Sequence, residues 1–331
     1  LILYFCISFM EDSGYMARAA FIMDKVMHRI GLHGKSFIPL IMGFGCNVPA
    51  IMASRAIESR SSRIITILIN PFMSCSARLP VYVLLVGTFF PTHAALIFMG
   101  LYILGILVAM LTARLLRRFL FKKDETPFVM ELPPYRLPTL RASLRHTWEK
   151  GKEYIRKMGG IILFASIVVW ALNYFPMHRQ QSYEVTVAEN MDDDIIDPSR
   201  DSYLEMMGKF INPVMKPLGF NWRASVAALA GVPAKEIVVS TLGVLYTGDG
   251  ADDSERLGAR LSSSTAGRQG FTPAVALSFM IFILLYCPCL ATVAAIARET
   301  GTWWYSLFSI VYNTAVAWLI AFAVYRIVLL L

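Results

Sequence analysis

The sequence predicts an all-α polytopic membrane protein, a helical bundle with two similar repeats that contain broken helices. Three observations support this prediction: an apolar composition, charges gathered between long uncharged windows, and Gly and Pro recurring inside apolar segments. Of the 331 residues, 56% are hydrophobic and 16% are charged, and the mean hydropathy is +0.55. Soluble domains are typically about 25% charged. Long windows without charge are what a bilayer requires of segments that cross it.

The apolar windows define the predicted membrane spans. A helix needs about 20 residues to cross about 30 Å of hydrocarbon. The chain lacks an initiator Met and both begins and ends inside apolar runs, so we interpret it as a fragment of a longer protein. The first window is interpreted as the tail of a span, and the full set of windows is 1–10, 37–56, 64–90, 94–120, 159–176, 222–246, 273–297 and 303–329.

Four of these windows carry proline in their interior. A proline inside a helix removes a backbone hydrogen bond and clashes with the preceding turn. In a membrane, the carbonyl groups that are freed must face protein or a water-filled cavity. Several interrupted spans in one bundle therefore indicate a transport path. The prolines are Pro39 and Pro49 in 37–56, Pro71 and Pro80 in 64–90, Pro233 in 222–246, and Pro288 in 273–297.

The loops predict the orientation of the chain. The connector 113–158 is rich in Lys and Arg, which places it in the cytoplasm, and its latter half, 140–158, is predicted to be a basic amphipathic helix at the anionic inner surface. The loop 177–221 is acidic and is predicted to be external. The net charge of +8 does not indicate nucleic-acid binding, because the basic residues flank spans. The predicted parts are 1–112, the connector 113–158, and 159–331, which contains a second repeat at 222–297 and a final helix at 303–329.

Two stretches of the chain resemble each other. Residues 43–53 read GFGCNVPAIMA and residues 229–240 read LAGVPAKEIVVS, so that Gly and then Val-Pro-Ala recur inside a span. Each stretch is followed by a second broken span, which reads PFMSCSAR at 71–78 and YCPCLAT at 286–292. Duplicated broken helices are the sequence pattern of a substrate site near the bilayer midplane.

Cysteines occupy the interruptions of three of the broken spans, and thiolates are soft ligands for metals such as Cu(I), Zn(II) and Fe(II). Oxygen atoms nearby would complete a mixed cage that is weak enough to release its ion. The alternative is that each Cys packs as a small apolar residue. The candidate metal ligands are Cys46, Cys75, Cys287, Cys289, Asn47, Ser74 and Glu236.

Charged residues inside spans are costly and usually functional. Glu236 is predicted either to ligate or relay a cation, or to form a buried ion pair with Arg78 that joins two helices. Lys235 precedes Glu236, so on a helix the two side chains diverge by about 100° and do not simply neutralise each other. No Ser/His/Asp, Cys/His or paired-carboxylate arrangement is found, and no catalytic residue is predicted.

Six stretches of the chain together carry a resemblance to a known family. They are EDSGYMARAAF (11–21), GKSFIPLIMGFGCNVPAIMASRAIESR (34–60), NPFMSCSARLPVY (70–82), ETPFVMELPPYRLPT (125–139), AKEIVVSTLGVLY (234–246) and CPCLATVA (287–294). They resemble ferrous iron transport protein B, and the resemblance covers nearly the whole chain. It implies a membrane domain with two Gate-type repeats whose cysteines line an iron path, at positions that match Cys46, Cys75 and Cys289.

The resemblance further implies transport of Fe²⁺ across the bacterial inner membrane, with no enzyme activity and no bound cofactor in this chain. GTP with Mg²⁺ is expected in a cytoplasmic GTPase domain that precedes the membrane part of the family and is missing from this sequence. The expected partners are Fe²⁺, the lipid bilayer, that GTPase domain, small accessory Feo proteins and further copies of the protein.

Two other functions compete with iron transport. A nucleoside or other organic-solute transporter that shares the Gate repeat would place hydrogen-bonding side chains at the helix breaks and would have no use for three thiols. A heavy-metal pump is suggested by Cys287-Pro288-Cys289, but the sequence contains neither the Asp-Lys-Thr-Gly phosphorylation motif nor the large soluble domain of such pumps.

Overall fold

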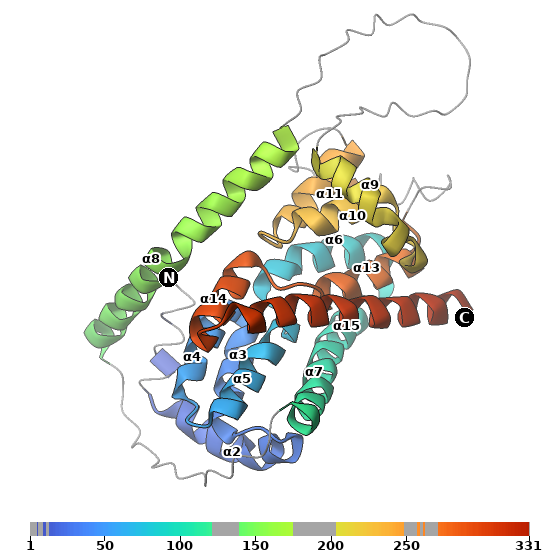
Figure 1. The fold of residues 1–331 in the computed structure, drawn as a ribbon. Coiled ribbons are helices and arrows are strands. Elements are labelled where there is room, and N and C mark those ends of the chain that lie inside the picture. Colours follow the sequence, from blue (N-terminus) through green and yellow to red (C-terminus); the bar gives the residue numbers. More distant parts are fainter. Residues whose placement is uncertain are drawn as a thin grey trace, which may run out of the picture.

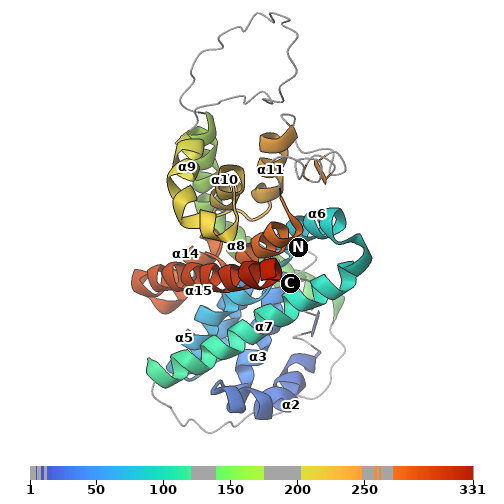
Figure 2. The same cartoon turned by 90° about the vertical axis from the view of Figure 1, so that its right-hand side faces the viewer.

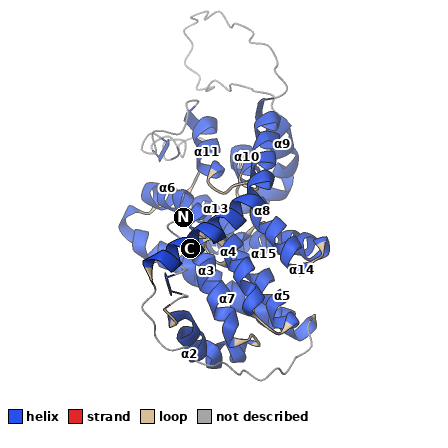
Figure 3. Cartoon of the chain, turned by 90° about the vertical axis from the view of Figure 1, so that its left-hand side faces the viewer, coloured by secondary structure: helices blue, strands red, loops and turns tan. Residues whose placement is uncertain are grey.

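The computed structural model describes residues 13–120, 139–174, 203–247 and 271–330, together with residues 5, 9–10, 257–258 and 261. All regular secondary structure in this part of the chain is helical, which confirms the predicted all-α class (Figure 3). Residues 121–138 and 175–202, most of 248–270, and most of the predicted span 1–10, including Cys6, lie outside the described residues.

The first half of the chain forms a series of helices that are interrupted at the predicted places (Figure 1). The first, α2, ends at Gly31, which adopts a left-handed conformation with φ of 87°, a conformation that glycine adopts without steric cost. The helices of this half are α2 (Tyr15–Ile30), η1 (Gly34–Ser36), α3 (Phe37–Gly45), α4 (Asn47–Ala53), η2 (Ser54–Ala56), α5 (Arg60–Ile69), η3 (Asn70–Phe72), η4 (Ser76–Arg78), α6 (Leu79–Phe89), η5 (Pro91–His93) and α7 (Ala94–Phe119).

The second half is built in the same way and ends in a long uninterrupted helix. Helices α9 to α11 gather at the end of the structure that lies opposite α2, as both side views show (Figures 1 and 2). The helices of this half are α8 (Leu140–Tyr174), α9 (Tyr203–Met215), η6 (Lys216–Leu218), α10 (Trp222–Ala230), α11 (Ile237–Thr247), α13 (Pro273–Leu285), α14 (Leu290–Thr300) and α15 (Trp303–Leu330).

Four helical segments are long and apolar enough to cross a membrane, and they agree with four of the predicted spans. They are Arg60–Phe89, Pro91–Phe119, Pro273–Thr300 and Trp303–Leu330. The predicted spans 37–56 and 222–246 are each divided into two short helices instead. Irregular backbone of this kind is tolerated at membrane depth only where other protein elements or a water-filled cavity surround it.

Two boundaries differ from the sequence prediction. Residues 140–158 and the predicted span from 159 belong to one continuous helix of 35 residues, α8, because no proline interrupts this stretch. Part of the predicted acidic loop 177–221 is helical, since α9 occupies Tyr203–Met215.

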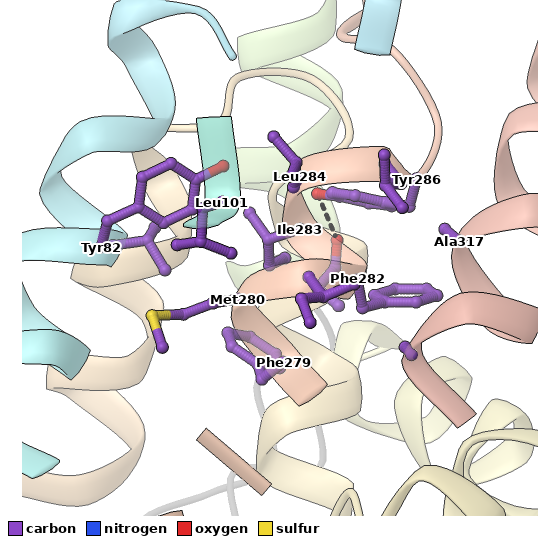
Figure 4. Packing of buried hydrophobic residues seen from close by; sticks show 14 of the residues in the cluster. Tyr82, Leu101, Phe279, Met280, Phe282, Ile283, Leu284, Tyr286 and Ala317 are labelled. Carbon is purple, nitrogen blue, oxygen red and sulfur yellow. Dashed lines mark hydrogen bonds between the residues drawn. The ribbon is translucent and has the colours of Figure 1, made fainter. Parts of the chain in front are cut away.

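The centre of the structure is α13, whose side chains are buried on all sides. It packs against α15, α6 and α7, and Phe279, Met280, Phe282 and Ile283 lie among residues such as Tyr82 and Ala317 (Figure 4). The outer faces of α7 and α15 expose large apolar side chains, including Leu96, Met99 and Leu319. Exposed apolar stripes on long helices are suited to contact with lipid.

Candidate functional site

The first repeat contains two helix breaks. Cys46 is extended, with φ of −156° and ψ of 129°, and it separates α3 from α4. Pro49 falls in the first turn of α4, where a missing backbone N–H costs little. The second break runs from Met73 to Cys75, between η3 and η4, and both of these residues are extended.

The second repeat contains two breaks in corresponding places. Residues 231–236 separate α10 from α11, and residues 286–289 separate α13 from α14. Glycine relieves crowding in the first of these, because a Cβ atom at Gly231 would lie 2.3 Å from Val238 Cγ2 and 2.7 Å from the Tyr286 hydroxyl. Tyr286 and Cys289 are extended at either end of the second.

Within each repeat, hydrogen bonds join the two breaks to each other. In the first repeat, Ser76 Oγ donates to the Gly45 carbonyl over 2.9 Å and Asn70 Nδ2 donates to the Asn47 carbonyl over 3.4 Å. In the second, Leu290 N donates to the Val232 carbonyl over 3.2 Å. The two breaks are thus joined by side-chain donors in the first repeat and by a backbone donor in the second.

Between the repeats, α4 packs against α14. Their contact is a small apolar cluster formed by Val48, Ile51, Ile67, Ala291, Ala294, Ala295 and Ile296. Cys46 and Cys289 both border this cluster, one from each repeat. Cys75 and Cys289 lie near enough to Cys46 to act on it electrostatically. Cys46 and Cys289 therefore lie where the two repeats meet, and Cys75 lies near enough to Cys46 to act on it.

The described cysteines are all free thiols. Cys289 Sγ lies 3.0 Å from the Thr292 hydroxyl, whereas Cys287 is buried and its Sγ donates to the Pro288 carbonyl over 3.3 Å. Across the described residues, no three His, Cys, Asp or Glu side chains converge closely enough to hold a metal ion. The thiols are neighbours without forming a closed cage.

Oxygen atoms of the first repeat lie buried beside these breaks without hydrogen-bond partners among the described atoms. They are Asn47 Oδ1, Asn70 Oδ1 and Ser74 Oγ, on side chains that are at most 5% exposed. Ser74 lies beside the Tyr82 hydroxyl, but the two make no hydrogen bond of good geometry. A buried polar oxygen without a partner is costly, so a ligand or water would be favoured here. Asn70 was not among the predicted ligands, although it directly precedes Pro71, which marks the interruption of the predicted span 64–90.

Two basic side chains are buried at the breaks. Arg78 is 1% exposed and Lys235 is 2% exposed. Arg78 donates from Nη1 to the Met73 carbonyl and from Nη2 to the Pro71 carbonyl, each over 3.0 Å. The alternative of an Arg78–Glu236 ion pair is wrong, because Glu236 is exposed and Arg78 bonds to carbonyls of its own break. Glu236 is nevertheless among the charged groups that act on Cys46.

Ion pairs surround the polar end of α4. Arg55 binds Glu299 with both oxygens of the carboxylate, over 2.6 Å and 2.5 Å, and so joins η2 of the first repeat to α14 of the second. Lys35 Nζ lies 2.6 Å from Glu58, which is more exposed. The hydrogen bond from Lys35 lowers the pKa of Glu58. Sequence reasoning had not identified either pair, because partners so far apart in the chain leave no local pattern.

Two family models match the chain. The model described as "Nucleoside recognition", named Gate, matches residues 1–89 and 155–303, which is more than half of the chain. The model described as "Ferrous iron transport protein B C terminus" matches residues 98–150. No solved structure matches the chain significantly.

Similar proteins come from bacteria and from an archaeon. A Porphyromonas gingivalis protein named "Fe(2+) transport protein A/Fe(2+) transporter FeoB fusion protein" is 54% identical over 99% of this chain and 42% of its own length. Proteins named "Fe(2+) transporter FeoB" are 44% identical in Staphylococcus aureus, over 99% of this chain, and 42% identical in Methanocaldococcus jannaschii, over 97% of it. Both matches cover 46% of the relative, so the chain spans about half the length of the curated relatives it matches. The chain therefore belongs to the ferrous iron transport protein B family.

Proposed function

We propose that this chain forms the membrane path of an Fe²⁺ transporter in the bacterial inner membrane. The observation that supports the proposal is that Cys46 and Cys289, one from each repeat, border the same inter-repeat cluster, with Cys75 near enough to act on Cys46. Thiolates favour soft and borderline cations such as Fe²⁺. The buried oxygens of Asn47 and Ser74 would add weaker ligands from the first repeat.

A path for a metal needs ligands that bind and then release the ion. The thiols are adjacent but do not form a preassembled cage, at least among the described residues. Cys287 and Glu236 complete the proposed set, Cys287 as a neighbour of Cys289 and Glu236 as an exposed carboxylate near Cys46.

The transport cycle is proposed to depend on groups outside the described path. GTP with Mg²⁺ would bind a GTPase domain elsewhere in the complete protein, and no catalysis is assigned to this chain. The Porphyromonas gingivalis relative is named as a fusion with Fe(2+) transport protein A, which supports small accessory Feo proteins as partners. Self-association is also proposed. The connector 113–158 would face the cytoplasm and the loop 177–221 the outside, with 1–112 and 159–331 as the two repeat-bearing halves.

An organic-solute transporter is less well supported. The name of the Gate model refers to nucleoside recognition, but a nucleoside site needs convergent hydrogen-bonding side chains. The first repeat does place the unpartnered oxygens of Asn47, Asn70 and Ser74 beside its breaks, but four thiols also lie at the breaks of the two repeats, and a nucleoside site has no use for them.

The test is Fe²⁺ uptake into anaerobic proteoliposomes that contain the complete native protein, with GTP present. A variant with Cys46, Cys75 and Cys289 all replaced by Ser is measured beside it. Uptake by the native protein and not by the variant is expected. Equal uptake by both would keep iron as the substrate and return the cysteines to packing roles, while no uptake by well-folded native protein would contradict iron transport.

A further inference from the structure

Lys235 places a buried positive charge in the second repeat without a carboxylate partner. Its Nζ donates to the Cys287 carbonyl over 2.6 Å and lies 3.2 Å from the centroid of the Tyr286 ring. Throughout the described ranges, Lys235 makes no ion pair with Asp or Glu, and its neighbour Glu236 is exposed. A buried ammonium is stable only if dipoles or π faces replace its hydration.

The surroundings of this ammonium group are those of a cation site. The Cys287 carbonyl belongs to the buried break that follows α13, close to the negative end of the dipole of that helix. The groups that act electrostatically on Lys235 are Arg78, whose like charge opposes the ammonium, and the thiol groups of Cys287, Cys289 and Cys75, which favour it. A carbonyl at a broken helix and several sulfur atoms are the groups that would receive a divalent metal ion.

Arg78 provides the contrast within the same site. It holds the first repeat's break with hydrogen bonds from two nitrogens of one planar group, which fixes its position. Lys235 holds its break with one hydrogen bond and one ring contact. An ammonium on a flexible four-carbon stem can leave its position by rotating single bonds, whereas a guanidinium held at two points cannot easily do so.

We propose that Lys235 is a tethered cation that occupies the metal position of the second repeat when the path is empty and moves away when a divalent cation enters. This inference rests on the proposed function, and it assigns to Lys235 the control of cation binding and release in the same path. Displacing one positive charge as another arrives limits the charge that accumulates in the buried site. The returning ammonium would then weaken the hold of the thiols on the ion and promote its release.

Replacing Lys235 by Met tests this directly, because Met keeps an unbranched side chain and removes the charge. If the ammonium competes with the metal, Lys235→Met should bind Co²⁺ about tenfold more tightly or better, since a like charge at contact distance is removed. Binding is measured on the complete protein in detergent, from the thiolate-to-cobalt absorption band. Lys235→Arg keeps the charge and is expected to bind Co²⁺ no more tightly than the native protein.

Transport kinetics provide a readout that a purely structural role would not produce. Lys235→Met should lower both the KM and the maximal rate of Fe²⁺ uptake, because the ion binds better and leaves more slowly. Unchanged or weaker Co²⁺ binding by a folded Lys235→Met protein would overturn the proposal, and thiol-dependent uptake by the native protein would then leave the proposed function intact. Failure of the well-folded native protein to transport iron would contradict both the proposed function and the proposed role of Lys235.

A second variant, Lys235→Ala, allows the proposal to be tested even if Lys235→Met does not fold. Lys235→Ala leaves a gap that ethylammonium can fill, so added ethylammonium should compete with Co²⁺ in this variant and not in the native protein. Equal insensitivity of both proteins to ethylammonium would contradict a cation position at Lys235.

Discussion

The two repeats share their broken helices but fill the breaks with different chemistry. In the first repeat, Arg78 binds two carbonyls of its own break, and unpartnered oxygens of Asn47 and Ser74 lie close by. In the second, Lys235 binds one carbonyl beside the thiols of Cys287 and Cys289. Each repeat carries two cysteines at its breaks. The repeats differ in the basic group, which makes two hydrogen bonds in the first repeat and one in the second, and in the unpartnered oxygens of the first repeat.

The largest expected effect on folding comes from removing the buried basic group of the first repeat, the guanidinium of Arg78. Arg78→Met leaves the buried carbonyls of Pro71 and Met73 without donors, and hydrogen bonds to a charged group each contribute about 1.5–3 kcal/mol. We expect a severe loss of folded protein, measured as the monodisperse fraction after heating in detergent. Lys235→Met, which frees one carbonyl, should lose clearly less. A similar loss of folded protein from both substitutions would show that Arg78 and Lys235 contribute equally to holding their breaks.

The effect of replacing a cysteine on Fe²⁺ uptake should depend on the position of that cysteine. Cys75→Ser and Cys289→Ser are each expected to reduce Fe²⁺ uptake about tenfold at unchanged membrane level, since each removes one soft ligand. Cys287→Ser serves as the comparison and should have a smaller effect, because Cys287 is buried whereas Cys75 and Cys289 are partly exposed. Uptake is measured in anaerobic proteoliposomes. Normal uptake by both Cys75→Ser and Cys289→Ser would exclude a thiol path.

The contact between the repeats can be loosened from its polar end. Glu299→Gln removes the charge that holds Arg55 across the two repeats, and Glu299 is only 9% exposed in its side chain. In Glu299→Gln, we expect Cys46 and Cys289 to react with a small maleimide several-fold faster than in the native protein. The labelling of each cysteine is measured by mass spectrometry. The control Glu58→Gln alters an exposed pair, of a kind that contributes little, and should leave labelling unchanged. Equal rates in all three proteins would argue against a closed contact.

The smallest expected effect concerns helix packing at the second repeat. Gly231→Ala places a Cβ atom 2.3 Å from Val238 Cγ2 and should lower the midpoint of thermal aggregation by a few degrees. Gly87→Ala is the control, since nothing lies within 4 Å of its added Cβ and Ala is favoured over Gly in helices by about 1 kcal/mol. A tolerated Gly231→Ala would show that the breaks of the second repeat do not pack closely.

The sequence predicted the elements better than the contacts between them. The breaks at Cys46, Cys75 and Cys289 followed from proline and from apolar windows of limited length, which are local signals. The bond from Lys235 to Cys287 joins residues 52 positions apart, and the Arg55–Glu299 pair joins residues 244 apart. No local pattern encodes such partners. The expected Arg78–Glu236 pair is not formed because Arg78 finds carbonyls five and seven residues away.

The central claim is that thiols from both repeats meet one ion. The most direct test is protection of the complete native protein from maleimide under anaerobic conditions, with each cysteine followed by mass spectrometry. We predict that Fe²⁺ protects Cys46, Cys75 and Cys289 together and that Mg²⁺, which prefers oxygen ligands, protects none of them. Labelling of these three cysteines that is the same with Fe²⁺, with Mg²⁺ and with no metal would contradict the account.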